Sequence, residues 1–242
     1  MTLTQRPEVC LGIPGDPFTL FYDYDQIEEH KLTPLTPTEK ALWFQARLCM
    51  TYLDPLRRIW KDPAVFERLL GSKVKPSDVC SFSIAGMGIM LNIVEALGSF
   101  RRPDISASSA RDRNWQMFKD FLSNHMCEWN VNEPNSGACI PDVLWKSFRN
   151  GITHDLRVDS VDQSGSLWGS LEFREHFDDP QRRRFEKHGQ LLRVCPREFF
   201  DDLRNGVGDY FSKLLLGDDL LDKFRERFDE VYPNCQATTS AR

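Results

Sequence analysis

The feature that most constrains the fold is a long apolar segment, Ser77–Gly98, in the first half of the chain. Its side chains are apolar nearly all round a helix, which is typical of a helix covered on every side. The main apolar run, Phe82–Val94, contains Asn92 and is too short to cross a bilayer. The segment therefore predicts the central helix of a bundle, where Gly86 and Gly88 would let a neighbouring helix approach closely.

Other segments with helical periodicity supply the neighbours of this central helix. The firmest start is Thr36-Pro37-Thr38-Glu39, a capping box with proline at the first helical position. We expect Pro55 to kink the helix that starts at this capping box and covers residues 36–60. The predicted helices, besides the central one, cover residues 36–60, 62–70, 109–129, 141–151, 196–214 and 218–231.

The rest of the pattern predicts a mainly α protein, a helical bundle with a small β-hairpin or three-stranded insertion. Residues 1–35 look like an extended N-terminal arm, 36–232 form a single helical domain, and 233–242 form a flexible tail. The insertion covers 156–194, with a β-hairpin over roughly 156–176 and a third strand over 191–194. Between them lies a charged loop, 178–189, that contains Arg182, Arg183 and Arg184.

Composition narrows the classes of function. The net charge is −5, and residues 1–37 hold six acids against two bases, which argues against a constitutive nucleic-acid coat protein. Seven cysteines are scattered without a C-x-x-C pair, and His125 and Cys127 have no second ligand pair, so we expect no disulfide framework, metal site or cofactor. His125 fits a core or interface position better than a catalytic one. No signal peptide precedes the apolar segment, which favours a cytoplasmic protein outside the membrane.

The residues most suited to chemistry lie in Ile140–Arg157, which reads IPDVLWKSFRNGITHDLR. Pro141 suits a first helical position, and Gly151 offers a place for the helix to end. Arg149 and His154 would then lie near an exposed helix end. The guanidinium can hold a phosphate by two hydrogen bonds, and the imidazole can relay protons near neutral pH.

A helix that ends with this pattern resembles the HEPN superfamily, whose hallmark is an arginine, four to six residues and a histidine. Here the motif runs from Arg149 to His154 with four residues between them, and Asn150 is the polar residue that follows the arginine in the family. The surrounding SFRNGITHDL and the helices from Thr36 to residue 232 share in the resemblance. The insertion after the histidine departs from the simple family plan.

The resemblance implies a metal-independent endoribonuclease, in which the 2′-hydroxyl of RNA attacks the adjacent phosphate. Arg149 would stabilise the developing charge, His154 would move protons, and Asn150 would orient the histidine or contact the phosphate. It also implies RNA as substrate, a homodimer that pairs two motifs, and a toxin–antitoxin or phage-defence role. In some HEPN toxins, a partner nucleotidyltransferase modifies a tyrosine two residues after the histidine. That position is Leu156 here.

Three observations keep an alternative open. The spacing also occurs at Arg183 and His188, where we interpret it as a solvated charge run. At about 100° per residue, Arg149 and His154 would lie roughly 140° apart on an unbroken α-helix. Arg149 could also cap its helix or pair with Asp142 or Asp155.

The alternative is therefore a non-catalytic HEPN-type module that binds RNA or nucleotides or assembles with a partner.

Glu95, a carboxylate on the central apolar segment, is expected to point outward or to pair with Arg101 or Arg102, because a lone buried carboxylate is costly.

Overall fold

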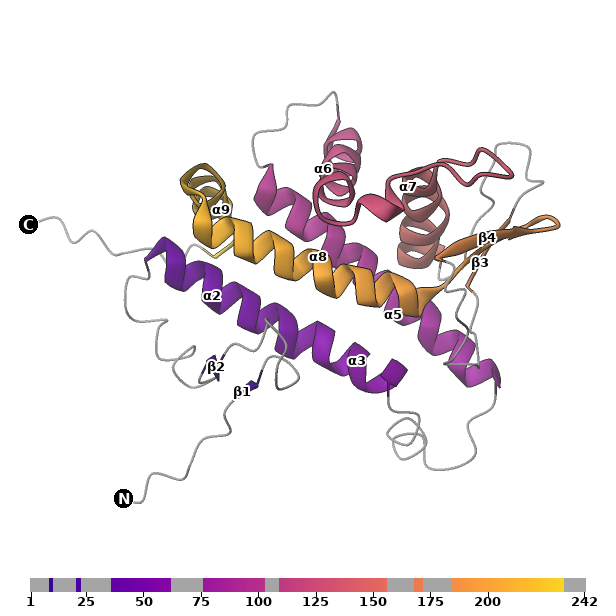
Figure 1. The fold of residues 1–242 in the computed structure, drawn as a ribbon, viewed down its shortest axis with the longest axis horizontal. Coiled ribbons are helices and arrows are strands. Elements are labelled where there is room, and N and C mark those ends of the chain that lie inside the picture. The colour runs from indigo at the N-terminus through magenta and orange to yellow at the C-terminus, as the bar shows by residue number, and fades with distance from the viewer. Residues whose placement is uncertain are drawn as a thin grey trace, which may run out of the picture. The chain divides into compact units, whose positions relative to one another are not determined.

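The structure is a computed structural model that describes residues 9–10, 21–22, 36–61, 76–102, 109–155, 168–171 and 184–232. The predicted helix at 62–70, the predicted tail at 233–242 and most of the predicted arm lie outside the described residues. Within that arm, β1 (Val9–Cys10) pairs antiparallel with β2 (Phe21–Tyr22). The described chain is mainly helical with a small sheet (Figure 1), so the predicted fold class is confirmed.

The contacts within the chain group it into two compact units, residues 1–56 with 208–242 and residues 57–207. Two helices contribute to both units: α3 (Asp54–Lys61) and α8 (Pro196–Leu216). The single domain expected over residues 36–232 stays a prediction.

The first unit is built on α2 (Pro37–Leu48) and α9 (Asp218–Val231), which pack together. The predicted capping box is present, because Thr36 accepts from the amide of Glu39, whose carboxylate accepts from the amide of Thr36 at 2.7 Å. Rings from α2, α8 and α9 and the adjoining Tyr232 fill the space between the helices. They belong to Trp43, Phe44, Phe211, Phe224, Phe228 and Tyr232.

The irregularity expected at Pro55 takes the form of a π-helical segment, η2 (Cys49–Leu53), just before α3. Proline has no amide hydrogen, and its ring clashes with the carbonyl four residues earlier. Wider π-helical winding before Pro55 relieves that clash without ending the helix. Burial raises the pKa of the Cys49 thiol to about 12, with a further contribution from Asp54, so this cysteine is a poor nucleophile.

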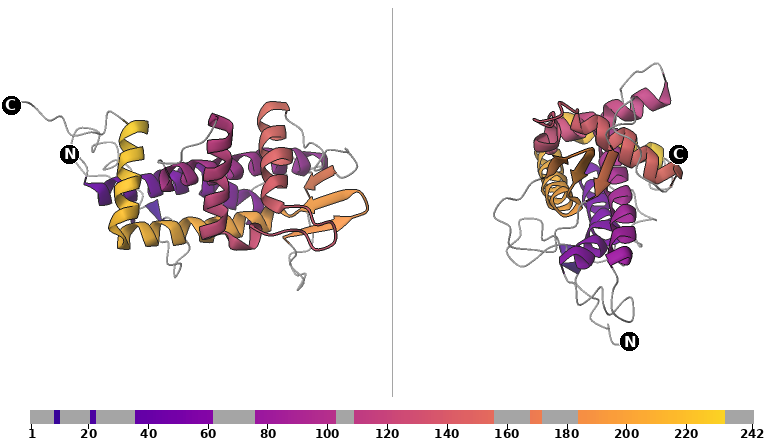
Figure 2. Two further views of the ribbon diagram at one scale, coloured as in Figure 1. Left: turned by 90° about the horizontal axis from the view of Figure 1, so that it is seen from above. Right: turned by 90° about the vertical axis from the view of Figure 1, so that its right-hand side faces the viewer.

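The second unit is organised around α5 (Pro76–Arg101), the predicted central helix. It packs against α6 (Ala110–His125) and η4 (Leu144–Asp155), and both cross it in Figure 2. The short helices η3 (Cys127–Trp129) and α7 (Ile140–Val143) connect α6 to η4. Among the side chains of α5 that are fully buried are Met87, Met90, Leu91, Val94 and Leu97.

Close approach to α5 depends on two of its glycines. A Cβ at Gly88 would lie 2.8 Å from Cγ2 of Ile152 on η4, so the approach expected at Gly88 is confirmed. A Cβ at Gly98 would lie 2.6 Å from the carbonyl carbon of Met117 on α6. Both neighbours therefore pack directly against the backbone of α5.

The small sheet has the order β3-β5-β4, with β3 (Trp168–Leu171) parallel to β5 (Leu191–Val194) and β4 (Phe185–His188) antiparallel to it. The three-stranded insertion and its last strand are as predicted. Most of the predicted hairpin at 156–176 lies outside the described residues, and its described part, β3, pairs with β5. A hairpin joins β4 to β5 through Gly189, whose φ is +60°. The charged loop expected at 178–189 includes the strand β4.

One described segment, Ile84–Arg101, is long and apolar enough to cross a membrane by length and composition, although the run Phe82–Val94 alone is too short. Because 56% of that window is buried inside the protein, it is consistent with the core helix of a soluble protein.

Gly98→Ala is expected to destabilise the protein. Replacing glycine by alanine in a helix normally stabilises it by about 0.5–1 kcal/mol. Here the added methyl group would overlap the Met117 carbonyl, and overpacking costs about 1–3 kcal/mol. Thermal or urea unfolding of Gly98→Ala beside Ser99→Ala measures the difference. A stability equal to or above that of the wild type would contradict the close α5–α6 packing.

Candidate functional site

The helix that carries the motif is not an ordinary α-helix. It begins at Ile140 with Pro141 in its first turn, as predicted, and becomes π-helical from Leu144 to Asp155. The expected helix end at Gly151 is wrong. Gly151 is buried, and the next residue, Ile152, is the one that packs against Gly88 of α5. At the position where we expected the chain to bend, η4 instead continues and makes a tight contact with α5.

The π-helical winding changes the relation between Arg149 and His154. In an α-helix the hydrogen bond joins residues four apart, and residues four apart share a face. In a π-helix the hydrogen bond joins residues five apart, so residues five apart take that place. The backbone positions of Arg149 and His154 thus lie one π-turn apart on one side of η4, and the separation expected for an α-helix does not apply. The His154 side chain lies outside the described residues, so its convergence with Arg149 stays a prediction.

The Arg149 guanidinium is held by a carboxylate on the central helix. Its Nε donates to Oε2 of Glu95 at 2.8 Å, and Nη2 lies 2.8 Å from the same oxygen. The two side chains are 18% and 17% exposed, respectively. Glu95 therefore pairs with Arg149 and not with Arg101 or Arg102, so that expectation was wrong. Asp142, a partner considered for Arg149, pairs with Lys146 at 2.9 Å.

Two further contacts fix the guanidinium. It lies 4.9 Å from the centre of the buried Trp145 ring, within cation–π range. Its Nη1 donates to Oδ1 of Asn150 at 3.2 Å, so the described contact of Asn150 is with the arginine. The described contacts use three of the five N–H groups that an arginine carries. The other two N–H groups, one on Nη1 and one on Nη2, make no hydrogen bond to a described residue.

The aromatic residues that support Trp145 come from α6. Its ring centre lies 5.2 Å from that of Phe118 and 5.9 Å from that of Trp115. Neither contact is apparent from the sequence as a part of the site, although Trp145 lies four residues before Arg149, a spacing that would share one face of an α-helix. The pairing of Glu95 was missed because its partner lies 54 residues away.

In the second match to the motif spacing, Arg183 and His188, the histidine lies on a strand and not on a helix. Arg183 lies outside the described residues, while His188 is exposed at the end of β4 and not in a loop. The adjacent Arg184 makes two hydrogen bonds to Asp202, at 2.6 and 3.3 Å, and that bonding raises the pKa of Arg184. Asp202 also accepts from the indole nitrogen of Trp129 at 2.8 Å. Arg184, which lies within the predicted charged loop, thus anchors the hairpin to α8.

The remaining candidate of the sequence, His125, packs against the ring of Phe121 with centres 5.0 Å apart. Gly206 of α8 approaches its backbone, since a Cβ there would lie 2.7 Å from the His125 carbonyl oxygen. This setting agrees with a packing role. Among the described residues, no group of three histidine, cysteine or acidic side chains is arranged to hold a metal ion.

The loop that leads into the motif helix is centred on a buried carboxylate. Glu133 is 2% exposed and accepts hydrogen bonds from both the amide and the side chain of Asn135 and of Ser136. Burial would raise the pKa of Glu133, but these donors outweigh it and lower the pKa below its ordinary value. The charged form of Glu133 therefore stabilises the loop before Pro141.

No protein-family model matches this chain, and neither do curated proteins or solved structures. The HEPN resemblance therefore depends on the motif and its setting alone.

We expect Glu95 and Arg149 to be energetically coupled. In a double-mutant cycle of Glu95→Gln and Arg149→Met, the coupling energy should be about 1–2 kcal/mol, because a charged hydrogen bond is replaced in a half-buried setting. The exposed pair Asp142–Lys146, four apart on one helix, is the matched control and should give at most about 0.5 kcal/mol. Equal coupling in the two cycles, measured by urea unfolding, would refute the assigned partner.

Glu133→Gln should destabilise the protein by about 1–3 kcal/mol at neutral pH, because charged hydrogen bonds are lost. Since the pKa of Glu133 is lowered by folding, its contribution is present above the ordinary carboxyl pKa of about 4.3 and is lost as pH falls through the lowered value. The stability gap between wild type and variant should therefore narrow below about pH 4. Glu128→Gln, at an exposed carboxylate nearby, is the control, and a gap independent of pH would contradict the effect.

Proposed function

We propose that this protein is a metal-independent endoribonuclease of HEPN type, acting as a cytoplasmic homodimer in a toxin–antitoxin or phage-defence system. The observation that carries the proposal is the π-helical spacing of Arg149 and His154, which places the two residues one turn apart. π-Helical turns are rare and often occur at functional sites. The fixed guanidinium of Arg149 adds support, because preorganised donors stabilise a transition state best.

The chemistry needs no group beyond the chain and the RNA. The 2′-oxygen of the substrate attacks the adjacent phosphorus, and its proton passes to a neutral imidazole acting as base. The bond from phosphorus to the 5′-oxygen breaks, and a protonated imidazole donates to that leaving oxygen. The products are a 2′,3′-cyclic phosphate and a 5′-hydroxyl. One His154 supplies one of these roles, and the His154 of a second copy would supply the other.

Arg149 would act here as a fixed hydrogen-bond donor. Glu95 offsets its positive charge, so its attraction for a distant phosphate is weaker than that of a free arginine. Its two outer N–H groups would meet the non-bridging phosphate oxygens, where charge increases in the transition state. Asn150, bonded to Nη1, would help to fix the same edge.

The second candidate is a non-catalytic module that binds RNA or a nucleotide or assembles with a partner. The contact between Glu95, Arg149 and Trp145 favours it, because this contact joins η4 to α5 and would stabilise the fold without any substrate. Under this hypothesis Arg149→Ala lowers the melting temperature, and the wild-type protein cleaves no RNA.

The deciding measurement is RNA cleavage by wild type and His154→Ala in the presence of EDTA. The proposal expects cleavage with 2′,3′-cyclic phosphate ends in the wild type and a rate at least about 100-fold lower in the variant, the contribution typical of acid–base catalysis.

His188→Ala is the matched control, since His188 belongs to the second match to the motif and is exposed on β4. It should cleave like the wild type. Circular dichroism establishes that each variant is folded. Folded His154→Ala with undiminished cleavage would remove the assignment, and an inactive wild type would favour the binding module.

A further inference from the structure

We propose that an exposed face of α6, formed by Arg111, Trp115 and Lys119, binds single-stranded RNA and leads it toward Arg149. The inference deepens the proposed function by naming the surface that binds the RNA and the single-stranded form of that RNA. Delivery of the strand to Arg149 for cleavage rests on the proposed function. Binding itself is argued from separate observations, which are the spacing of these three residues, their contacts and the charges around them.

The three residues form a stripe of cation, indole and cation. They are spaced four apart on a regular α-helix, so they share one face. Arg111 and Lys119 are exposed and Trp115 is partly exposed. The ammonium of Lys119 lies 5.8 Å from the centre of the Trp115 ring, over its face. Proteins that bind single strands without sequence preference combine these two elements, aromatic side chains for the bases and cations for the backbone.

The stripe is connected to the motif by an unbroken series of ring contacts. The Trp115 ring centre lies 5.9 Å from that of Trp145, and the Arg149 guanidinium lies 4.9 Å from the centre of Trp145. Each of these two distances is about the spacing of one or two stacked bases. A strand whose base stacks at Trp115 therefore needs only a few nucleotides to bring a phosphate to the outer edge of Arg149.

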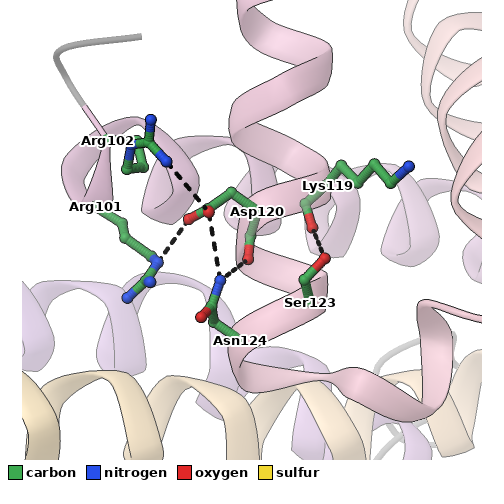
Figure 3. Close-up of polar contacts among 6 residues, drawn as sticks. All are labelled: Arg101, Arg102, Lys119, Asp120, Ser123 and Asn124. Atoms are coloured by element: carbon green, nitrogen blue, oxygen red, sulfur yellow. Dashed lines mark hydrogen bonds and ion pairs between the residues drawn. The ribbon is translucent and has the colours of Figure 1, made fainter.

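The bases of α6 outnumber its acids although the whole chain is acidic, with Arg111, Arg113 and Lys119 against Asp112 and Asp120. One of the acids of α6, Asp120, is neutralised by the end of α5, since Arg101 donates to it at 2.6 Å and Arg102 lies at 3.8 Å. Figure 3 shows both arginines converging on Asp120, while Lys119 points away from them. Arg111 and Lys119 form no ion pair with a described residue, so their charges stay available for phosphates.

The geometry favours a single strand over a duplex. Bases in a duplex are stacked within the helix and leave no ring face for an indole, whereas an unpaired base can turn out and stack on it. On binding, a base can take the place of the Lys119 ammonium over the Trp115 ring. The flexible lysine then reaches the next phosphate. The stripe has no arrangement for reading base edges, so the binding should depend little on sequence.

The test is fluorescence anisotropy with a labelled 12-nucleotide single strand of 2′-O-methyl RNA, which lacks the attacking hydroxyl and is not cleaved. We expect Trp115→Leu to weaken binding by about tenfold, as for loss of one base stack. Lys119→Ala should weaken it less and lower the slope of log affinity against log salt by about 0.7, the value for one phosphate contact on a single strand. Lys213→Ala, an exposed lysine on α8, is the matched control and should change nothing.

Each outcome decides the proposal. Equal affinity of wild type, Trp115→Leu and Lys119→Ala overturns it, as does equal or tighter binding of the duplex of the same sequence. Trp115 also packs against Phe118 and Trp145, so Leu at this position could disturb the fold. Lys119→Ala and Arg111→Ala alter only exposed side chains, and they keep the test valid in that case.

The two proposals can fail separately. Weakened binding by the α6 variants together with undiminished cleavage by His154→Ala would leave a binding surface without the assigned catalyst. Loss of cleavage in His154→Ala with unchanged binding by the α6 variants would leave the catalyst and remove this surface. A wild type that binds no nucleic acid would overturn this inference.

Discussion

The second unit depends on how closely two helices approach the backbone of α5. Gly88 admits Ile152 of η4, and Gly98 admits the backbone of α6 at Met117. At such short range, the side chains beside each contact have little freedom, because protein interiors are close-packed. Glu95 lies between the two glycines, seven residues after the first and three before the second. The approach of η4 thus brings Arg149 within hydrogen-bond distance of this carboxylate and fixes its guanidinium.

Local chemistry explains which parts could be predicted from the sequence. The capping box at Thr36, the central helix and the proline at the start of the motif helix follow from a few adjacent residues, and all are present. Glu95 and Arg149 are 54 residues apart, and β5 pairs in parallel with a strand more than 20 residues earlier. Such contacts depend on the packing of whole elements, which a local pattern does not encode.

The π-helix is the most instructive difference. Nothing in SFRNGITHD distinguishes a π-helix from an α-helix, because both expose one side and bury the other. What selects the wider winding is the need to bury Ile152 against Gly88 while Arg149 meets Glu95. An α-helix with Gly151 as its end would satisfy the local preference of glycine but leave Ile152 outside the core. The gain from burying a large aliphatic side chain, about 1.5–3 kcal/mol, exceeds the usual cost of a glycine within a helix, about 1 kcal/mol.

The pairing of Arg149 bears directly on its chemistry. The Arg149 side chain is 18% exposed, and its guanidinium lies over Trp145 and is bonded to Glu95, so it has lost rotamer freedom before any ligand arrives. Ordering the side chain is part of the free-energy cost of binding, and here the fold has already ordered it. The arrangement therefore positions the guanidinium accurately, while the charge of Glu95 weakens its long-range attraction for an anion. In the proposed function this attraction would come from elsewhere, and Arg111 and Lys119 on α6 are the residues that we propose to supply it. Separation of the two tasks would let a protein of net charge −5 hold a polyanion on one face while keeping a nearly neutral pair beside the reacting phosphate.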